Sequence, residues 1–294
     1  MSARIVECVP NFSEGRNQTV IDAISNAGRG IPGARVLGIE PDVDYNRTVL
    51  TIAGEPEAVS EAAFRVITAA LEHIDMRNHE GEHPRIGAVD VCPFIPLKNV
   101  TMEECVEMSK ELAKRVSREL CIPAFLYGAA ASSPERNLLS DLRKGQYEGL
   151  KNRLENGGPH LPDFGPIEWT ETVSRFGAVV IGARGILVAY NVNVNEKDAK
   201  AAKIAGSLVR TTGRLLKRED GRRTRIPGML EMVQGMGLPL EAHGISQVSM
   251  NLRDVSVTPM HIAYEAVKSI VNDHGVQTCG SELVGLVPLS AMLE

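Results

Sequence analysis

Apolar and polar residues follow two spacings along the first third of the chain, one typical of strands and one typical of helices. Short apolar runs are separated by stretches in which apolar residues recur every three or four positions. The pattern predicts strands at residues 5–9, 35–38, 47–53 and 90–97 and helices at residues 20–27 and 55–71. The order of elements is therefore strand, helix, two strands, helix, strand.

The last third of the chain repeats this plan. The pattern predicts strands at residues 186–190, 244–251 and 282–289, a short segment at residues 255–257, and helices at residues 199–208 and 258–270. Both second helices begin beside a proline, which suits the first turn of a helix because its missing N–H has no partner there. A repeat of this length indicates an internal duplication.

The repeated order is that of the ferredoxin-like fold, in which helices cover one face of a sheet. We therefore expect an α+β protein (an α/β sandwich) with a tandem duplication of two ferredoxin-like βαββαβ subdomains, residues 1–180 and 181–294. A helix with a capping box at residues 101–104 and a strand at residues 124–127 are expected to extend the first subdomain. Residues 152–166, rich in glycine and proline, are predicted to be a connector.

Composition places the chain among ordinary globular proteins, with 43% hydrophobic and 23% charged residues. A formal net charge of −5, with six Phe, five Tyr and one Trp, offers little for nucleic-acid binding. Five cysteines without a C-x-x-C pair indicate buried thiols rather than a disulfide framework. No signal peptide or membrane span is predicted. We expect a cytoplasmic protein that binds neither nucleic acid nor membranes.

Residues 79–83 have the H-E-x-x-H spacing of zinc peptidases, which place both histidines on one helix face. Gly81 would cost such a helix about 1 kcal/mol, and Pro84 disfavours the helical conformation at His83. We therefore predict a polar loop and no metal. A histidine there can exchange protons near pH 7, which suits catalysis, while an exposed, salt-bridged turn is the alternative.

Residues 40–47 form a second charged cluster between two predicted strands. Its acidic side chains could hold a cationic substrate nitrogen, and Arg47 could bind a carboxylate through two parallel hydrogen bonds. A charged hairpin loop without a function is the alternative. The cluster lacks the later ligands of a calcium-binding loop.

Residues 214–225 form a third cluster, in which six of the twelve residues are basic. They could bind phosphate or carboxylate groups. Nucleic acid is a weaker candidate because no aromatic residues interleave with the basic ones. The alternative is a solvated, mobile linker.

Long blocks of the sequence resemble glutamate formiminotransferase, the domain that animals carry fused to a cyclodeaminase. The blocks are residues 6–15, 46–49, 81–85, 87–96, 163–166, 182–184, 233–237 and 281–288. They span nearly the whole chain, and blocks of this length are more specific than any single motif. The resemblance implies a stand-alone form of this enzyme.

The resemblance implies an activity, co-substrates and partners. A glutamate formimidoyltransferase moves the formimino group of N-formimino-L-glutamate to N5 of tetrahydrofolate, in histidine degradation and one-carbon metabolism. A homodimer, a folate tunnel between the subdomains, and a separate cyclodeaminase for the product are also implied. The alternatives are transfer of a formyl group, transfer from formiminoglycine, or a non-catalytic folate-binding protein.

The resemblance also assigns residues. The family's catalytic histidine falls on His83, which we expect to act as general acid and base. The residues expected to bind folate are Gly165, Pro166, Ile167, Glu168, Trp169, Thr170, Ser174, Arg175, Phe176 and Gly177. The residues expected to orient His83 or to bind the substrate are Glu40, Asn46, Arg47, Glu82, Arg85 and Asp90.

Overall fold

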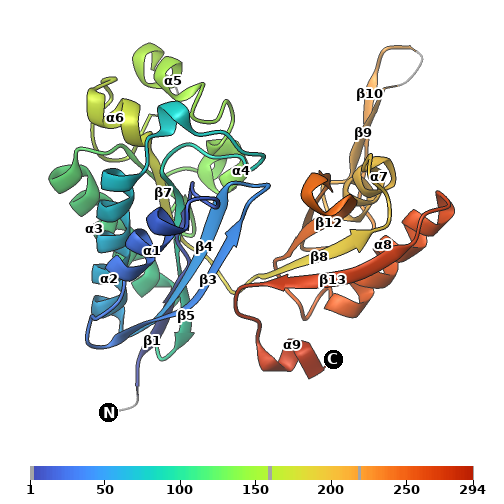
Figure 1. The fold of residues 1–294 in the computed structure, drawn as a ribbon, viewed down its shortest axis with the longest axis horizontal. Helices are drawn as coiled ribbons and strands as arrows, with labels where there is room; N and C mark the ends of the chain where they lie inside the picture. Colours follow the sequence, from blue (N-terminus) through green and yellow to red (C-terminus); the bar gives the residue numbers. More distant parts are fainter. Residues whose placement is uncertain (1–2, 158–160, 218–219, 294) are drawn as a thin grey trace. The chain divides into compact units, whose positions relative to one another are not determined.

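A computed structural model describes residues 3–157, 161–217 and 220–293 of the chain. The chain forms two compact units, Met1–Gly185 and Ile186–Glu294. Each combines a sheet with helices, so the predicted α+β class is confirmed (Figure 1). None of the helices in the described ranges is long and apolar enough to cross a lipid bilayer.

The first unit contains a seven-stranded sheet. Its strands are β1 (Ile5–Cys8), β2 (Asn11–Phe12), β3 (Ala34–Asp42), β4 (Arg47–Gly54), β5 (Val89–Lys98), β6 (Ala124–Gly128) and β7 (Val179–Ala183). Successive parts of β4 and β5 pair with β1 and with β2, and β3 pairs with the other edge of β4. These pairings are antiparallel, whereas β5–β7 and β6–β7 are parallel. The predicted strand at residues 124–127 therefore joins this sheet.

Helices cover one face of this sheet (Figure 1). They are α1 (Gln18–Ala27), α2 (Pro56–His73) and α3 (Met102–Leu120). The capping box predicted for α3 is present: the side chains of Thr101 and Glu104 each accept a hydrogen bond from the other residue's backbone N–H. Side chains alternate between the two faces of a strand, so Cys8 and Cys92 face the helices while Glu7 and Val91 face away.

The other face of the sheet is divided between apolar and polar surfaces. Val91 and Val180 pack against short helices that follow β6. These are α4 (Leu139–Leu142), α5 (Leu150–Asn156) and α6 (Glu171–Phe176). The short helix η2 (Pro134–Arg136) precedes α4, and η1 (Met76–Asn78) follows α2. On β2 and β4 the same face carries Asn11 and Arg47, whose side chains are bonded to each other. The polar part of the face is where the candidate site lies.

The second unit has a four-stranded antiparallel sheet of order β11-β12-β8-β13. Its elements are β8 (Val188–Val194), α7 (Lys200–Val209), β11 (Val233–Leu240), η3 (Glu241–His243), β12 (Ile245–Leu252), α8 (Met260–Asp273), β13 (Thr278–Val284) and α9 (Leu289–Leu293). Two further strands, β9 (Arg214–Lys217) and β10 (Arg223–Ile226), form a separate hairpin. The strands of the corresponding elements of the first unit pair in the same order, β3-β4-β1-β5.

Three local predictions were wrong. Strand β11 was not predicted, because Gly235, Gly237 and Pro239 interrupt its alternation with residues that are rare in strands, and residues 255–257 form a turn. Antiparallel pairing along β12 forms β11 nevertheless. The basic run at residues 214–225 contains a hairpin rather than a mobile linker.

The predicted connector at residues 152–166 was also wrong in part. Residues up to Asn156 belong to α5, because Leu150 and Leu154 are four positions apart and both pack into the core. Residues 158–160 lie outside the described residues, and the chain passes from one unit to the other at residues 185–186.

Candidate active site

Three loops of the first unit meet at the candidate active site: residues 13–17, 42–46 and 79–87. Asn46 holds them together. The N–H of Gly15 donates to Asn46 Oδ1 (2.9 Å), and Asn46 Nδ2 donates to the carbonyl of Glu80 (2.7 Å). The backbone of Asn46 has a φ of 48°, which asparagine tolerates better than most residues. Asn46 therefore acts as a clamp between the loops.

Two glycines allow the loops to approach each other. A Cβ at Gly15 would lie 2.1 Å from the carbonyl oxygen of Asp42, and one at Gly81 would lie 2.5 Å from that of Tyr45. Both distances are far below any real contact, so no side chain fits at either position. Residues 79–83 form no helix, as predicted, and the two histidines are held by different partners.

His83 is buried beside Arg47, with 8% of its surface exposed. Its Nε2 lies 3.4 Å from Arg47 Nη1. Arginine can only donate, so Nε2 is the acceptor and the proton of the neutral ring is on Nδ1. The backbone N–H of His83 donates to the carbonyl of Tyr45 (3.4 Å), and the Tyr45 ring packs edge-on against the imidazole.

The electrostatic surroundings of His83 are strongly positive. Burial lowers its pKa well below the ordinary value, and the charges of Arg47, Arg143 and Arg85 lower it further. The ring is therefore neutral at pH 7 and can accept a proton. Once protonated among these cations, it becomes a strong acid. His83 thus has the properties needed to take a proton and return it.

Arg47 presents an unused donor. Its Nη1 donates to Asn11 Oδ1 (3.1 Å), and its guanidinium lies over the Tyr45 ring at 5.3 Å. Its Nε is buried and has no hydrogen-bond partner among the described residues. Burial also lowers the pKa of Arg47. A buried donor without a partner carries an energetic penalty that a bound anion would remove.

Asp90 holds a second arginine at the site. Its side chain is 1% exposed and accepts a hydrogen bond from the Ile86 N–H (3.0 Å) and another from Arg143 Nη2. Arg143 also has a buried Nε without a partner among the described residues. Both described contacts of the Asp90 side chain are thus with groups other than His83.

Arg85 has no donor left for a substrate. Its Nη1 and Nη2 form a bidentate pair with Glu148, at 3.0 and 2.8 Å. Its remaining N–H groups reach His79 Nδ1, the His79 carbonyl and Gln146 Oε1. His79 Nε2 donates in turn to the carbonyl of Asn46 (3.0 Å). Arg85 therefore supports the loop that carries His83.

The two glutamates predicted for this site lie on different elements. Glu40 is half-buried on β3, opposite Val49 of β4. Glu82 is exposed next to His83, and its backbone N–H donates to the carbonyl of Asp44 (3.4 Å).

Residues 165–177, expected to bind folate, run along the same unit and end near the His83 loop. Gly177 forms an isolated bridge with Gly87. The Tyr147 hydroxyl donates to the carbonyl of Ser174 (2.5 Å), and the Tyr147 N–H donates to that of Arg85 (2.9 Å). Tyr147 thus links this stretch to the residue that supports the His83 loop.

Side chains of the stretch differ in accessibility. Gly165, Ile167, Glu168 and Thr170 are exposed, and Pro166, Trp169, Ser174 and Arg175 are half-buried. Phe176 is fully buried in the core beneath the helices, so its side chain has a packing role. Thr170 caps α6, and Trp169 packs against Tyr147 at 5.9 Å.

Two family models match the chain: "Formiminotransferase domain, N-terminal subdomain" over residues 5–184 and "Formiminotransferase domain" over residues 189–294. The chain belongs to the formiminotransferase domain family. The family predicted from the sequence blocks is therefore confirmed.

Curated relatives agree with this membership. The chain is 45% identical over 292 residues to the formimidoyltransferase-cyclodeaminase of Rattus norvegicus. The matched stretch covers 99% of this chain and 52% of that protein. It is 40% identical over 292 residues to the glutamate formimidoyltransferases of Streptococcus pyogenes serotype M1 and Thermoplasma acidophilum, covering 92% and 90% of those proteins. The chain spans about half the length of the formimidoyltransferase-cyclodeaminases that it matches.

Some residues of the candidate site were not singled out by sequence reasoning. Asn11 lies in the first family block, so the block contained a signal for it. Arg143 and Tyr147 lie outside the quoted blocks, in a segment with several short helices. Only folding brings this segment against residues 85–90.

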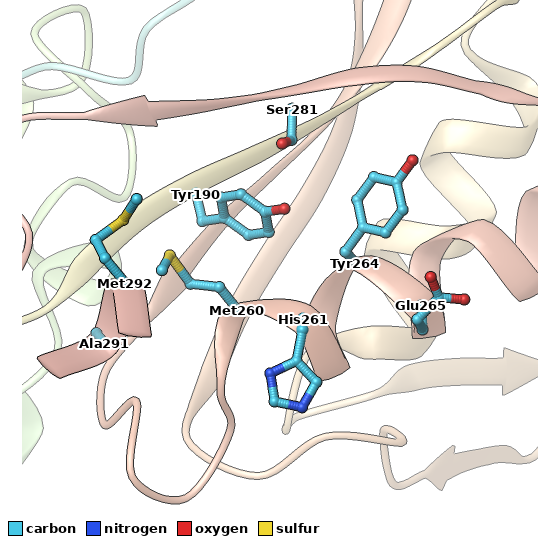
Figure 2. A pocket seen from close by; sticks show the side chains of 8 residues that line it. All are labelled: Tyr190, Met260, His261, Tyr264, Glu265, Ser281, Ala291 and Met292. Carbon is cyan, nitrogen blue, oxygen red and sulfur yellow. The ribbon is translucent and has the colours of Figure 1, made fainter. Parts of the chain in front are cut away.

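No group of three or more His, Cys, Asp or Glu side chains suited to a metal ion occurs among the residues that the structure describes. A separate pocket of about 360 Å³ lies in the second unit (Figure 2). It is lined by Tyr190, Met260, His261, Tyr264, Glu265, Ser281, Ala291 and Met292. It contains none of the residues predicted for catalysis or folate binding.

Proposed function

We propose that this protein is a glutamate formimidoyltransferase that moves the formimino group of N-formimino-L-glutamate to N5 of tetrahydrofolate. The observation that carries the proposal is a buried, neutral His83 beside two arginines, Arg47 and Arg143. The Nε–H of each arginine has no hydrogen-bond partner among the described residues. The names of the Streptococcus and Thermoplasma relatives support the same reaction.

His83 would move one proton in each direction. N5 of the folate attacks the amidine carbon and forms a tetrahedral intermediate, and His83 takes the proton that N5 loses. The protonated ring then gives this proton to the glutamate nitrogen as the carbon–nitrogen bond breaks. Glutamate leaves as a neutral amine, and the proton count is unchanged.

Arg47 and Arg143 would bind the carboxylates of the donor. A carboxylate that accepts from the two Nε–H groups satisfies buried donors that have no partner in the described ranges of the chain. Its negative charge also offsets the positive field that depresses the pKa of His83. Substrate binding would therefore raise the pKa of His83 toward neutrality, where proton transfer in both directions is efficient.

The remaining predicted residues take supporting places in this proposal. Residues 165–177 would contact folate through their accessible members, while Phe176 shapes the stretch from the core. Asp90 and Arg85 would position the site, and Glu40 and Glu82 would face the amidinium group.

We extend the proposal to the organisation of the protein. The common strand order of the two sheets supports a tandem duplication of ferredoxin-like subdomains. A homodimer in the cytoplasm, passing its product to a separate cyclodeaminase, completes the proposal. The names of the longer relatives include that second activity.

A coupled assay tests the activity. The protein is mixed with tetrahydrofolate and N-formimino-L-glutamate, and acid treatment should convert the 5-formimino product into the absorbing 5,10-methenyl form. His83→Asn should lower the rate at which the signal appears by roughly 10²–10⁴-fold. Replacing His73, an exposed histidine at the end of α2, by asparagine should leave this rate unchanged. Formiminoglycine and formylglutamate serve as competing donors. Silence with N-formimino-L-glutamate would overturn the proposal.

A further inference from the structure

The pocket of about 360 Å³ in the second unit is built by elements of that unit alone (Figure 2). Tyr190 comes from β8 and Ser281 from β13, and both lie on the face of the sheet that carries the core of this unit. Helix α9 contributes Ala291 and Met292. Each described lining residue therefore belongs to the unit Ile186–Glu294.

Helix α8 presents one side to the pocket over its first two turns. The lining residues of this helix are Met260, His261, Tyr264 and Glu265. Their spacing of about one turn places them on one face of the helix. Met260 and Tyr264 also pack against the core of the unit, so regular structure holds this side of the pocket in place.

The hydroxyl of Tyr190 has no hydrogen-bond partner among the residues that the structure describes. Only 8% of the surface of Tyr190 is exposed, and Figure 2 shows its hydroxyl pointing across the pocket toward Tyr264. The hydroxyl of Tyr264, by contrast, is bonded to Thr278 Oγ1 at 2.9 Å. A buried hydroxyl without a partner carries a free-energy penalty, which a polar group bound in the pocket would remove.

The charges around the pocket disfavour a charged ligand. Among its described lining residues, Glu265 is the single acid, and none is a lysine or an arginine. Both carboxylate oxygens of Glu265 accept from Lys268 Nζ, at 3.0 and 3.2 Å. An anion in the pocket would have no cation of its own, and a cation would compete with Lys268 for Glu265. Transfer of a charge out of water without a partner is costly.

Much of the remaining lining is apolar. Met260 and Met292 are thioethers, which adapt to the shape of a neighbouring group and make favourable contacts with the edge of an aromatic ring. In Figure 2, Met292 and Ala291 lie at one end of the pocket, with Tyr190 between them and Glu265. Apolar walls with a few polar groups are typical of sites for small molecules, and the volume lies in their usual range.

We propose that this pocket binds an uncharged aromatic or heteroaromatic compound of one or two rings, whose polar group bonds to the Tyr190 hydroxyl. The ring would contact the thioethers of Met260 and Met292 and the side of Tyr264. The inference concerns a second ligand site and does not depend on the transfer reaction. Both co-substrates proposed for that reaction carry carboxylates, so neither belongs to this class of ligand.

Binding would also tie α9 to the rest of the unit. Leu289 and Leu293 of this short helix are 73% and 78% exposed, while Ala291 is its buried member. A ligand that contacts Ala291 and Met292 adds contacts between α9 and the elements on the other sides of the pocket. Amide hydrogen exchange at residues 289–293 should therefore slow when the pocket is occupied.

Three probes with the same ring test the class of ligand. At pH 7, 2-(indol-3-yl)ethanol is uncharged, 2-(indol-3-yl)ethylamine is a cation and indole-3-propionate is an anion. In calorimetric titrations of the full chain, the alcohol should bind with a dissociation constant of about 1 mM or lower, as expected for a ligand of its size. The amine and the propionate should bind at least roughly tenfold more weakly.

Two results of these titrations would count against the proposal. Absence of binding by the alcohol overturns the site. A charged probe that binds as tightly as the alcohol overturns the uncharged class.

Tyr190→Phe tests the hydroxyl. Binding of the alcohol should weaken roughly fivefold, the size of one hydrogen bond, while the melting temperature stays unchanged because the hydroxyl has no protein partner to lose. Tyr264→Phe is the matched control: it makes the same chemical change in the same pocket, but at a hydroxyl already bonded to Thr278. Its affinity should stay within about twofold of the wild-type value. Equal affinities of the two variants overturn the role of Tyr190.

Ser281→Phe tests the location. Ser281 is exposed on the edge strand β13, so a phenyl ring there can fill the pocket without disturbing the core. This variant should lose binding of the alcohol, whereas Ser269→Phe, on an exposed position of α8 outside the lining, should keep it. Retained binding by Ser281→Phe overturns the location. Unchanged hydrogen exchange at residues 289–293 in the wild type with bound alcohol overturns the contact with α9.

Discussion

Replacing Asp90 by asparagine removes one charge from a buried pair while keeping the size of the side chain. Asp90 accepts from the Ile86 N–H (3.0 Å) and from Arg143, and its side chain is 1% exposed. Asparagine has one acceptor oxygen, so its NH2 group, which can only donate, must face either the Ile86 N–H or the Arg143 guanidinium. A hydrogen bond to a charged group contributes about 1.5–3 kcal/mol, and the lost partner leaves a buried charge. We expect the free energy of unfolding to fall by about 2–3 kcal/mol.

The same variant should change the chemistry of His83. Arg143 already lowers the pKa of His83, and removal of the Asp90 carboxylate leaves that charge without compensation. The acid limb of kcat/KM should therefore move to lower pH, because the free enzyme holds His83 neutral over a wider range. A merely structural role for Asp90 would leave the position of this limb unchanged.

Urea unfolding measures the stability effect, with an unchanged m-value as the sign that the two states are the same. Asp141→Asn is the control, since Asp141 pairs with the exposed Lys144 and should lose less than about 1 kcal/mol. Arg143→Met combined with Asp90→Asn should cost less than the sum of the single changes. A loss below about 1 kcal/mol for Asp90→Asn, or strict additivity of the pair, would refute the reasoning.

Three further predictions concern the same site. His83→Asn should lower kcat by roughly 10²–10⁴-fold, which is the usual contribution of general acid–base catalysis. The dissociation constant of a stable 5-formyl folate, measured by calorimetric titration, should stay within about twofold of the wild-type value. Near-normal turnover would contradict the prediction. Because the pKa of His83 is depressed in the folded state, the unfolded state binds a proton at this histidine more readily than the folded state as pH falls below about 6.5. The free energy of unfolding should therefore decline below that pH. Urea titrations of His83→Asn should show a smaller decline. Gly81→Ala should lower stability by at least about 2 kcal/mol, because its Cβ would lie 2.5 Å from the carbonyl oxygen of Tyr45; an unchanged melting temperature would show that the loops separate freely.

Local patterns were enough to predict most elements of both units. Helices α1, α2, α3 and α8 have apolar residues at helical spacing, and their first turns carry recognisable signals such as the capping box at Thr101. Strand β11 could not be predicted in this way. Its glycines and proline have low strand propensity, and its place is set by antiparallel bonds to β12, which are contacts between distant residues.

Family blocks in the sequence were enough to select His83, Arg47 and Asn46 as candidates. Only the tertiary structure separated their roles. Arg85 lies in the same block as His83, yet all of its donors are used by Glu148, Gln146 and His79.

The sequence by itself thus determined the family, the alternation of strands and helices, and the residue types that the chemistry needs. These depend on short spacings along the chain. Tertiary structure decided which arginines beside His83 keep a donor without a partner in the part of the chain that the structure describes. Arg143, for example, comes from a segment some sixty residues downstream of the His83 loop. Burial and unmet hydrogen bonds depend on which distant residues meet, and no local pattern contains that information.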